Sequence, residues 1–232
     1  EMCIRDRGMV FNTEASIDLA DDPVLMGMMV EAGFDAVFIG IETPDEDSLN
    51  ECNKKQNRNR DLIECVKRIQ RAGLQVQAGF IVGFDSDKRS IFQRQIDFIQ
   101  NSGIVTAMVG LLQAPPGTRL YGRLVEEGRL RDRMSGDHMD CTTNIIPKMD
   151  LHALLEGYRN IMDQIYSPKF YYKRVKIFLQ EYQAPKFKVP MDPQRFLAFF
   201  RSSIRLGIFG KERFHYWKIL LWTLLRRPAL LS

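Results

Sequence analysis

Polar side chains that could bind a ligand follow the apolar runs of this chain. They stand where such a run ends or turns, and they are Glu14, Ser16, Glu42, Thr43, Asp85, Asp87 and Gln113. Carboxylates in such places can bind ribose hydroxyls or an amine, and a glycine beside them lets the backbone approach a ligand closely. A plainer explanation exists for each: Asp85 suits a turn or a helix cap, and Gly83 suits a turn. The chemistry therefore depends on whether the fold brings these side chains together.

The stretch 37–57 shows how one of these acids is positioned. An apolar run ends at Glu42, and a short run bounded by turn residues is typical of a strand buried on both faces in a parallel sheet. Thr43, Pro44 and Glu46 suit the N-cap, the first helical position and a capping box. Glu42 is thus expected at the carboxyl end of a strand, where βα enzymes place their chemistry. The alternative is a solvated strand end with no role.

One unit recurs along the first half of the chain: a helix, a small residue, a glycine, an apolar residue and a strand. Its junctions are Ala32-Gly33-Phe34, Ala72-Gly73-Leu74 and Ser102-Gly103-Ile104. The predicted strands are 9–20, 34–41, 74–82 and 104–112, and the predicted helices are 23–32, a short one after Pro44, 60–72, 88–101 and 120–127. Alternation of this kind predicts right-handed crossovers and a parallel sheet. Since a closed barrel needs eight strands, we expect an open or partial barrel completed by strands upstream.

The second half of the chain has a different character. Beyond residue 135 no further βα unit is predicted, and four helices are expected at 151–165, 171–180, 194–206 and 212–226. They make an all-α appendage of roughly a hundred residues, a normal domain size. We therefore divide the chain into a boundary segment 1–8, an α/β part 9–133 and a helical extension 134–232.

Composition limits the classes of function. The 232 residues are 45% hydrophobic and 27% charged, an ordinary globular composition, and the net charge of +4 does not indicate a nucleic-acid partner. The four cysteines, Cys3, Cys52, Cys65 and Cys141, lack metal-site spacing and suit a reducing cytoplasm. Residues 1–7 lack an initiator methionine and a signal-peptide pattern. We expect a boundary scar there, and a chain that is the second half of a longer protein.

An ordered set of motifs resembles a known family. The motifs are GIET at 40–43, NKKQN at 53–57, AGFIVGFDSD at 78–87, PGTRLY at 116–121 and EGRL at 127–130. Together they resemble the radical S-adenosylmethionine (SAM) superfamily, and within it the bacterial group that has a cobalamin-binding domain, a radical SAM core and a helical extension. GDH at 136–138, PKM at 147–149 and GY at 157–158 resemble the start of that extension. The resemblance spans residues 10–232 and implies the C-terminal half of a partial (β/α) barrel followed by the all-α extension.

The resemblance also implies which residues bind the cofactor. Glu42 matches the residue near the nucleoside ribose, and Lys54 matches a basic residue that meets the methionyl carboxylate. The remaining positions face or support the adenine pocket: Gly79, Ile81, Gly83 and Asp85 on one strand, Pro116 and Gly117 in the following turn, and Glu14 and Ser16 on an earlier strand. All of these are expected to bind SAM. None is expected to be catalytic or to bind a metal.

The chain lacks three features of the family pattern. The CxxxCxxC loop for a 4Fe-4S cluster, the motif that grips the SAM amine and the cobalamin domain are absent from these 232 residues. The resemblance therefore implies part of a cobalamin-dependent methyltransferase that acts on an unactivated carbon of a small-molecule or lipid substrate. The alternatives are radical chemistry other than methylation, and a scaffold protein without a cluster.

The last predicted helix, 212–226, has two interpretations. Trp217 and Trp222 stand beside basic residues, which suits a membrane interface, and the apolar run is too short to span a bilayer. A stripe of aromatic residues is more often part of a core, so we favour a core helix whose packing partner lies elsewhere. The expected location is the cytoplasm, and peripheral contact of 212–227 with the inner membrane face is the alternative.

Overall fold

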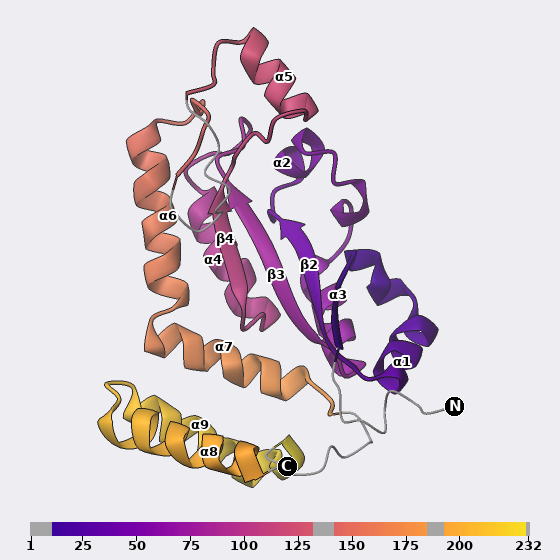
Figure 1. The fold of residues 1–232 in the computed structure, drawn as a ribbon, viewed down its shortest axis with the longest axis vertical. Helices are drawn as coiled ribbons and strands as arrows, with labels where there is room; N and C mark the ends of the chain where they lie inside the picture. The colour runs from indigo at the N-terminus through magenta and orange to yellow at the C-terminus, as the bar shows by residue number, and fades with distance from the viewer. Residues whose placement is uncertain (1–10, 132–141, 185–192, 231–232) are drawn as a thin grey trace.

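A parallel β-sheet forms the centre of the molecule. The computed structural model describes residues 11–131, 142–184 and 193–230. Its strands are β1 (Phe11–Ala15), β2 (Phe34–Glu42), β3 (Gln75–Val82) and β4 (Ala107–Leu111), which lie side by side in sequence order and all run parallel (Figure 1). The α/β class and the parallel sheet predicted from the sequence are therefore confirmed.

The helices that connect successive strands are α1 (Pro23–Ala32), α3 (Leu62–Arg71) and α4 (Ile91–Ser102). Each is followed by a glycine in the left-handed region, with φ of 98° at Gly33, 103° at Gly73 and 73° at Gly103. Residues with a side chain rarely adopt that conformation, so the repeated glycines end the helices where the sequence predicts.

The sheet is buried on one face. Alternate residues of β2 and β3, among them Val37, Ile39 and Ala78, pack in the hydrophobic core, whereas the residues between them are half-buried. The expectation that β2 is buried on both faces is therefore wrong for the described residues. The second face is lined by small or half-exposed residues such as Gly79 and, on β4, by the exposed Met108.

The strand predicted over 9–20 is wrong in its second half. β1 ends at Ala15, and a 3-10 helix, η2 (Ile17–Asp21), follows. Ile17, Leu19 and Ala20 are buried in the core from this short helix. An alternation of apolar and polar residues over so few positions satisfies either conformation, and packing selects the helix. β4 likewise begins at Ala107, three residues later than predicted.

The remaining helices lie near their predicted positions. They are α5 (Arg119–Glu126), α6 (Leu151–Ile165), α7 (Pro168–Glu181), α8 (Pro193–Ile204), the π-helix η4 (Arg205–Phe209), α9 (Arg213–Arg226) and the short 3-10 helix η5 (Pro228–Leu230). Pro168 occupies the first turn of α7, where its missing N–H costs nothing, so α7 begins three residues before the predicted 171. None of the helices in the described ranges is long and apolar enough to cross a membrane.

Helix α6 packs on α4 and shares the core of the sheet. Its Leu154, Tyr158, Ile161 and Ile165 belong to the same buried cluster as the strands. The ring of Phe92 lies against Gly157, where a Cβ atom would come within 2.3 Å of it. The predicted boundary at 133/134 and the segment 1–8 lie outside the described residues.

Helix α7 is joined to this core by a buried arginine. The Arg174 side chain is fully buried and donates hydrogen bonds to the carbonyl oxygens of Ile165 (2.8 Å) and Val105 (3.2 Å). Its guanidinium also lies over the rings of Tyr166 and Tyr171. These contacts hold α7 against the end of α6 and the loop that leads into β4. Below α7, the helices α8 and α9 form the far end of the molecule (Figure 1).

Candidate functional site

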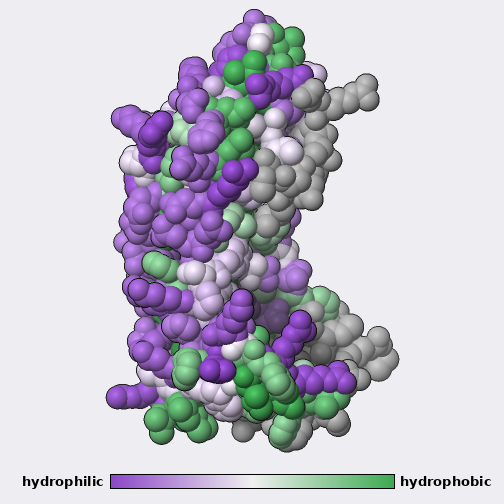
Figure 2. Space-filling model, turned by 90° about the vertical axis from the view of Figure 1, so that its left-hand side faces the viewer, coloured by the Kyte–Doolittle hydropathy of each residue, from purple (hydrophilic) through white to green (hydrophobic). Residues whose placement is uncertain are grey.

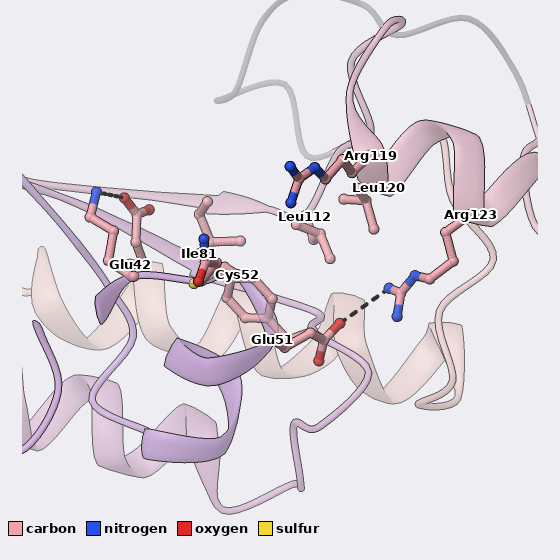
Figure 3. Close-up of a pocket in the computed structure, with 11 residues that line it drawn as sticks. Glu42, Glu51, Cys52, Ile81, Leu112, Arg119, Leu120 and Arg123 are labelled. Carbon is pink, nitrogen blue, oxygen red and sulfur yellow. Dashed lines mark hydrogen bonds and ion pairs between the residues drawn. The ribbon is translucent and has the colours of Figure 1, made fainter. Parts of the chain in front are cut away.

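A cavity of about 770 Å³ lies at the carboxyl edge of the sheet. One wall comes from the ends of β2 and β3 and from α2 (Glu46–Glu51), and α5 lies opposite them (Figure 3). The lining residues are Glu42, Glu51, Cys52, Asn53, Lys54, Ile81, Phe84, Leu112, Arg119, Leu120 and Arg123. The mixture of carboxylates, cations and aliphatic side chains suits a polar ligand that also has an apolar part.

Glu42 enters this cavity from an unusual backbone conformation. Its φ is 65°, in the left-handed region, and the pairing of β2 with β3 shifts register between Gly40 and Glu42. The buried Asn57 amide donates to the carbonyl oxygens of Gly40 (3.1 Å) and Ile41 (2.9 Å) at the bulge, where Ile41 O also accepts from Thr43 N (2.8 Å). Left-handed backbone at a residue other than glycine costs energy and is found at functional sites. It turns the Glu42 side chain towards the cavity.

Lys54 is the partner of Glu42. Its ammonium Nζ donates to Glu42 Oε1 at 2.8 Å, and the two side chains are 26% and 18% exposed. The pair lies directly over Gly40, where a Cβ atom would come within 2.4 Å of Glu42 Oε1 and 2.8 Å of Lys54 Nζ. Glycine at position 40 therefore provides the room for the pair.

The start of α2 differs from the predicted capping box. The N-cap is Asp45, whose carboxylate accepts hydrogen bonds from the backbone N–H groups of Asp47 and Ser48. Thr43, the predicted cap, accepts from Asp45 N, while Glu46 accepts from the distant Asn59 N. The prediction is wrong by two residues because Asp is as good a cap as Thr and stands closer to the helix.

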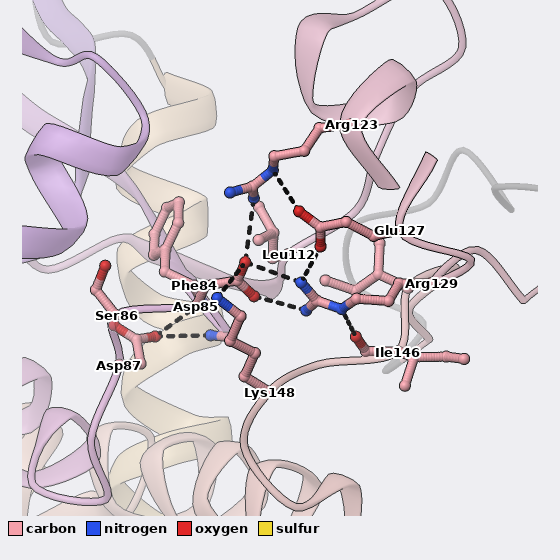
Figure 4. A network of polar contacts seen from close by, with 12 residues as sticks. Phe84, Asp85, Ser86, Asp87, Leu112, Arg123, Glu127, Arg129, Ile146 and Lys148 are labelled. Atoms are coloured by element: carbon pink, nitrogen blue, oxygen red, sulfur yellow. Dashed lines mark hydrogen bonds and ion pairs between the residues drawn. The ribbon is translucent and has the colours of Figure 1, made fainter. Parts of the chain in front are cut away.

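Asp85 lies in a network of cations at the end of β3 (Figure 4). Arg129 donates to both of its oxygens, at 2.6 and 2.9 Å, while Arg123 and Lys148 stand at 3.3 and 3.5 Å. The Asp85 side chain is only 8% exposed. The hydrogen bonds from Arg129, followed by the charges of the other cations, hold the pKa of Asp85 below its ordinary value. Asp85 is not among the residues that line the cavity.

The turn after β3 is held by two further carboxylates. Glu51 of α2 accepts from the backbone N–H groups of Asp85 (3.1 Å) and Ser86 (2.9 Å), and Asp87 accepts from those of Gly83 (2.8 Å) and Phe84 (3.1 Å). Charge-assisted bonds of this kind are among the stronger ones in proteins. They fix the turn that forms one wall of the cavity.

The opposite wall comes from α5. Thr118 caps this helix by accepting a hydrogen bond from Tyr121 N at 3.1 Å. Arg119 and Arg123 are one turn apart and both reach the cavity (Figure 3). Arg123 contacts Glu51 at 3.4 Å and so joins the two walls.

The structure brings together three of the ten residues that the resemblance nominates. Glu42, Lys54 and Ile81 line the cavity. Four of the other residues are exposed outside it: Glu14, Ser16, Pro116 and Gly117. Gly79 lies against Phe38 on the open face, and Gly83 packs against Leu154. Asp85 lies in its network of ion pairs. The cofactor-binding roles given to all ten stay predictions.

Several lining residues were missed from the sequence. Arg119, Arg123 and Leu120 belong to α5, and only the spacing of the two arginines by four residues signals a shared face. Glu51 and Asn53 lie within or beside the NKKQN motif, and Asn53 has φ of 56°. The neighbouring Cys52 is exposed as a residue, but its thiol is partly buried, and burial raises the pKa of the thiol, which disfavours the thiolate.

The described residues contain no group of three or more His, Cys, Asp or Glu side chains that could hold a metal ion. Cys52 is exposed and Cys65 is buried, and the two are not bonded to each other. Cys3 and Cys141 lie outside the described ranges. Among the described residues, then, the donor set for an iron–sulfur cluster is not present.

Comparisons with known proteins find one domain family and several methyltransferases to which the chain is similar. Residues 118–232 match the model of a domain of unknown function, DUF4070. The chain is similar to the uncharacterized methyltransferase sll1242 of Synechocystis (39% identity over 94% of the chain) and to the hopanoid C-2 methylase of Rhodopseudomonas palustris (30% over 92%). A bacteriochlorophyllide d C-12(1)-methyltransferase of Chlorobaculum tepidum is 26% identical over 73% of the chain. The chain spans 42%, 41% and 37% of these relatives' own lengths.

Proposed function

We propose that this chain is the C-terminal part of a cobalamin-dependent radical SAM methyltransferase, and that the cavity at the sheet edge holds the nucleoside end of SAM. The observation that carries the proposal is the Glu42–Lys54 pair in a cavity at the carboxyl edge of a parallel sheet, in a chain related to methyltransferases over most of its length. In this proposal the sheet is the C-terminal half of a partial barrel.

The cavity residues fit the chemistry of SAM. The Glu42 carboxylate would accept hydrogen bonds from the ribose hydroxyls, and the Lys54 ammonium would bind the methionyl carboxylate. Each would then exchange its present 2.8 Å contact for a ligand contact. Ile81, Leu112 and Leu120 offer an apolar surface for the adenine ring. These groups bind and orient the cofactor and exclude water from it.

The proposed reaction also needs an iron–sulfur cluster and cobalamin, which the cavity residues would not bind. The described residues do not offer the donors that a cluster needs. As the resemblance implies, we propose that polypeptide outside these 232 residues holds both groups, and we derive no step from the residues described.

For the substrate we propose a lipid or another large apolar molecule. The relatives are named for hopanoid and bacteriochlorophyllide substrates. The half-exposed second face of the sheet supports this choice, because Phe38 and Met108 offer apolar surface there.

Two measurements test the proposal. The reading frame upstream of the codon for Glu1 should encode a CxxxCxxC loop, and a start codon at that point would instead favour the scaffold alternative. Calorimetry should show clear SAM binding by the longer polypeptide and little or none by the 232-residue chain, which lacks the cluster that chelates SAM. Tight binding by the chain alone would contradict the idea that its site is incomplete.

A further inference from the structure

Helix α9 presents an apolar stripe to solvent. Phe214, Leu221 and Leu225 are 76%, 54% and 78% exposed. With Lys218 they are spaced by three and four residues, so they follow one another along a single face of the helix. Only Thr223 of α9 is fully buried. We refer to Phe214, Leu221 and Leu225 as the apolar stripe.

The neighbouring helices extend this surface. Leu197 and Phe199 of α8 and Ile208 and Phe209 of η4 are between 45% and 80% exposed. Trp217 Nε1 donates to the Gly207 carbonyl oxygen at 2.9 Å, which fixes α9 against η4. In Figure 2 apolar surface gathers at the lower end of the molecule, with polar side chains between the apolar ones. Large apolar side chains that gather at one exposed end of a molecule are typical of a binding surface.

A basic pocket opens beside the apolar stripe, between α7 and α9. Its volume is about 420 Å³, and its lining residues are Lys169, Tyr172, Lys173, Lys176, His215, Lys218, Ile219 and Trp222. Lys176 Nζ lies 5.1 Å from the centre of the Trp222 ring, and the Tyr172 and His215 rings stack at 5.9 Å. Lys218 belongs both to the pocket and to the helix face that carries the apolar stripe. Aromatic walls and ammonium groups therefore meet at the edge of the exposed apolar surface.

The charge of this pocket is not neutralised within the described residues. No carboxylate there lies within salt-bridge distance of Lys169, Lys173, Lys176 or Lys218, although many other lysines and arginines are paired. Burial, followed by the charge of Glu212, raises the pKa of Tyr172 in this pocket. The lining residues include four lysines and no carboxylate, so the pocket is basic.

We propose that this end of the molecule binds an anionic phospholipid surface. The basic pocket would take the phosphate of a lipid headgroup, and the apolar stripe would enter the boundary between headgroups and acyl chains. Two features favour a lipid over a protein partner: the ammonium groups complement anionic headgroups, and tryptophan and lysine side chains beside exposed leucines are typical of helices that lie in a membrane interface. The proposal does not depend on the reaction that the protein catalyses.

Vesicle co-sedimentation without SAM tests it. We expect the chain to pellet with vesicles of equal parts phosphatidylcholine and phosphatidylglycerol, and to stay in solution with phosphatidylcholine alone. Salt on the order of 1 M, where the Debye length is about 3 Å, should release most of the bound protein. Equal binding to both kinds of vesicle, or binding to neither, would overturn the proposal.

Paired variants separate the pocket from the stripe. The double variant Lys173→Gln/Lys218→Gln should lower the partition coefficient about thirtyfold, from the usual effect of each basic residue near an anionic surface. Leu221→Ser/Leu225→Ser should lower the partition coefficient on the order of a hundredfold, because the leucine surface that the lipid would bury is lost. The matched controls are Lys55→Gln/Lys88→Gln and Val24→Ser/Met28→Ser, which change exposed residues elsewhere.

Two further outcomes count against the proposal. Loss of binding by the control variants to the same extent would show a general charge or hydrophobicity effect. Sedimentation velocity would show whether the apolar stripe instead joins two copies of the chain: a wild-type dimer that becomes a monomer in Leu221→Ser/Leu225→Ser would overturn the lipid assignment. Because all substituted side chains are at least partly exposed, circular dichroism should show unchanged folding, so loss of binding can be read directly.

Discussion

The ends of β2 and β3 lie next to each other at one edge of the sheet, and an acid stands at each of them, Glu42 as the last residue of β2 and Asp85 just after β3, in very different environments. Glu42 has a single cation, Lys54, and faces a cavity. Asp85 has Arg129, Arg123 and Lys148 around it and is absent from the cavity wall. Both acids thus stand at a strand end, but only Glu42 lies where it can also bind a ligand.

The difference shows how to tell a binding acid from a structural one. When the oxygens of a carboxylate already accept hydrogen bonds from cations of the protein, binding a ligand would break those bonds. Glu42 has accepting capacity left, and it has a left-handed backbone of the kind found at functional sites, beside the carbonyl oxygen that Asn57 binds. We therefore expect substitutions at the two strand ends to affect different properties of the protein.

The largest effect should come from Arg129→Met. It removes the two shortest hydrogen bonds to Asp85, whose side chain is 8% exposed, and leaves a buried carboxylate with weaker partners. Breaking such a pair costs about 3 kcal/mol in the free energy of unfolding, to be measured by urea denaturation. Arg131→Met is the control, since Arg131 is exposed and in no ion pair among the described residues. A cost no greater than that of the control would show that the network contributes little.

Glu42→Gln should act on ligand affinity instead. In the longer polypeptide, loss of hydrogen bonds to a charged acceptor should weaken SAM binding by about 1.5–3 kcal/mol, or roughly tenfold to a hundredfold in Kd by calorimetry. Asp85→Asn should leave Kd unchanged and lower the melting temperature. If Glu42→Gln changes only the melting temperature, Glu42 is a structural acid like Asp85 and the distinction between the two strand ends is wrong.

Gly40→Ala gives a smaller and more specific effect. The new Cβ atom would displace the ends of the Glu42 and Lys54 side chains, which are flexible, so the stability cost should be about 1 kcal/mol or less. SAM affinity should nevertheless fall, because the pair is moved. Gly27→Ala in α1 is the matched control, since nothing lies within 4 Å of its new Cβ atom. Equal losses of affinity in both variants would show that the pair has no special part in binding.

The smallest effect is the pH dependence of Asp85. Its pKa is below the ordinary value when the protein is folded, so its stabilisation is complete above the unfolded-state pKa of about 3.9 and is lost as the pH falls through the folded-state pKa. The difference in free energy of unfolding between wild type and Asp85→Asn should therefore be constant near neutral pH and shrink below about pH 4. A difference that grows on acidification would contradict the assigned direction of the pKa.

What the sequence predicts well is local. Gly33 and Gly103 mark helix ends because the left-handed conformation is a property of the residue itself. The helix at 151–165 is predicted to the residue, since its apolar spacing and its Asp150 cap lie within one element. The parallel sheet follows from the order of such elements.

What it misses depends on contacts between distant segments. Asp85 could be predicted to stand at a strand end, but its partner Arg129 lies 44 residues further along and pairs with it only in the folded chain. Arg123 reaches Glu51 across 72 residues, and no local pattern signals that contact. The 3-10 helix after Ala15 likewise forms because Ile17 finds a place in the core.

Because α6 packs against the sheet, these two parts of the molecule should unfold together. Six residues of α6 are buried, whereas α9 has one, so α6 should keep its amide protons for as long as the sheet does. Helices α8 and α9 should exchange theirs through local opening, because they lie beyond α7, which Arg174 joins to the core (Figure 1). The far end of the molecule could then rearrange on a surface while the cavity at the sheet edge keeps its shape.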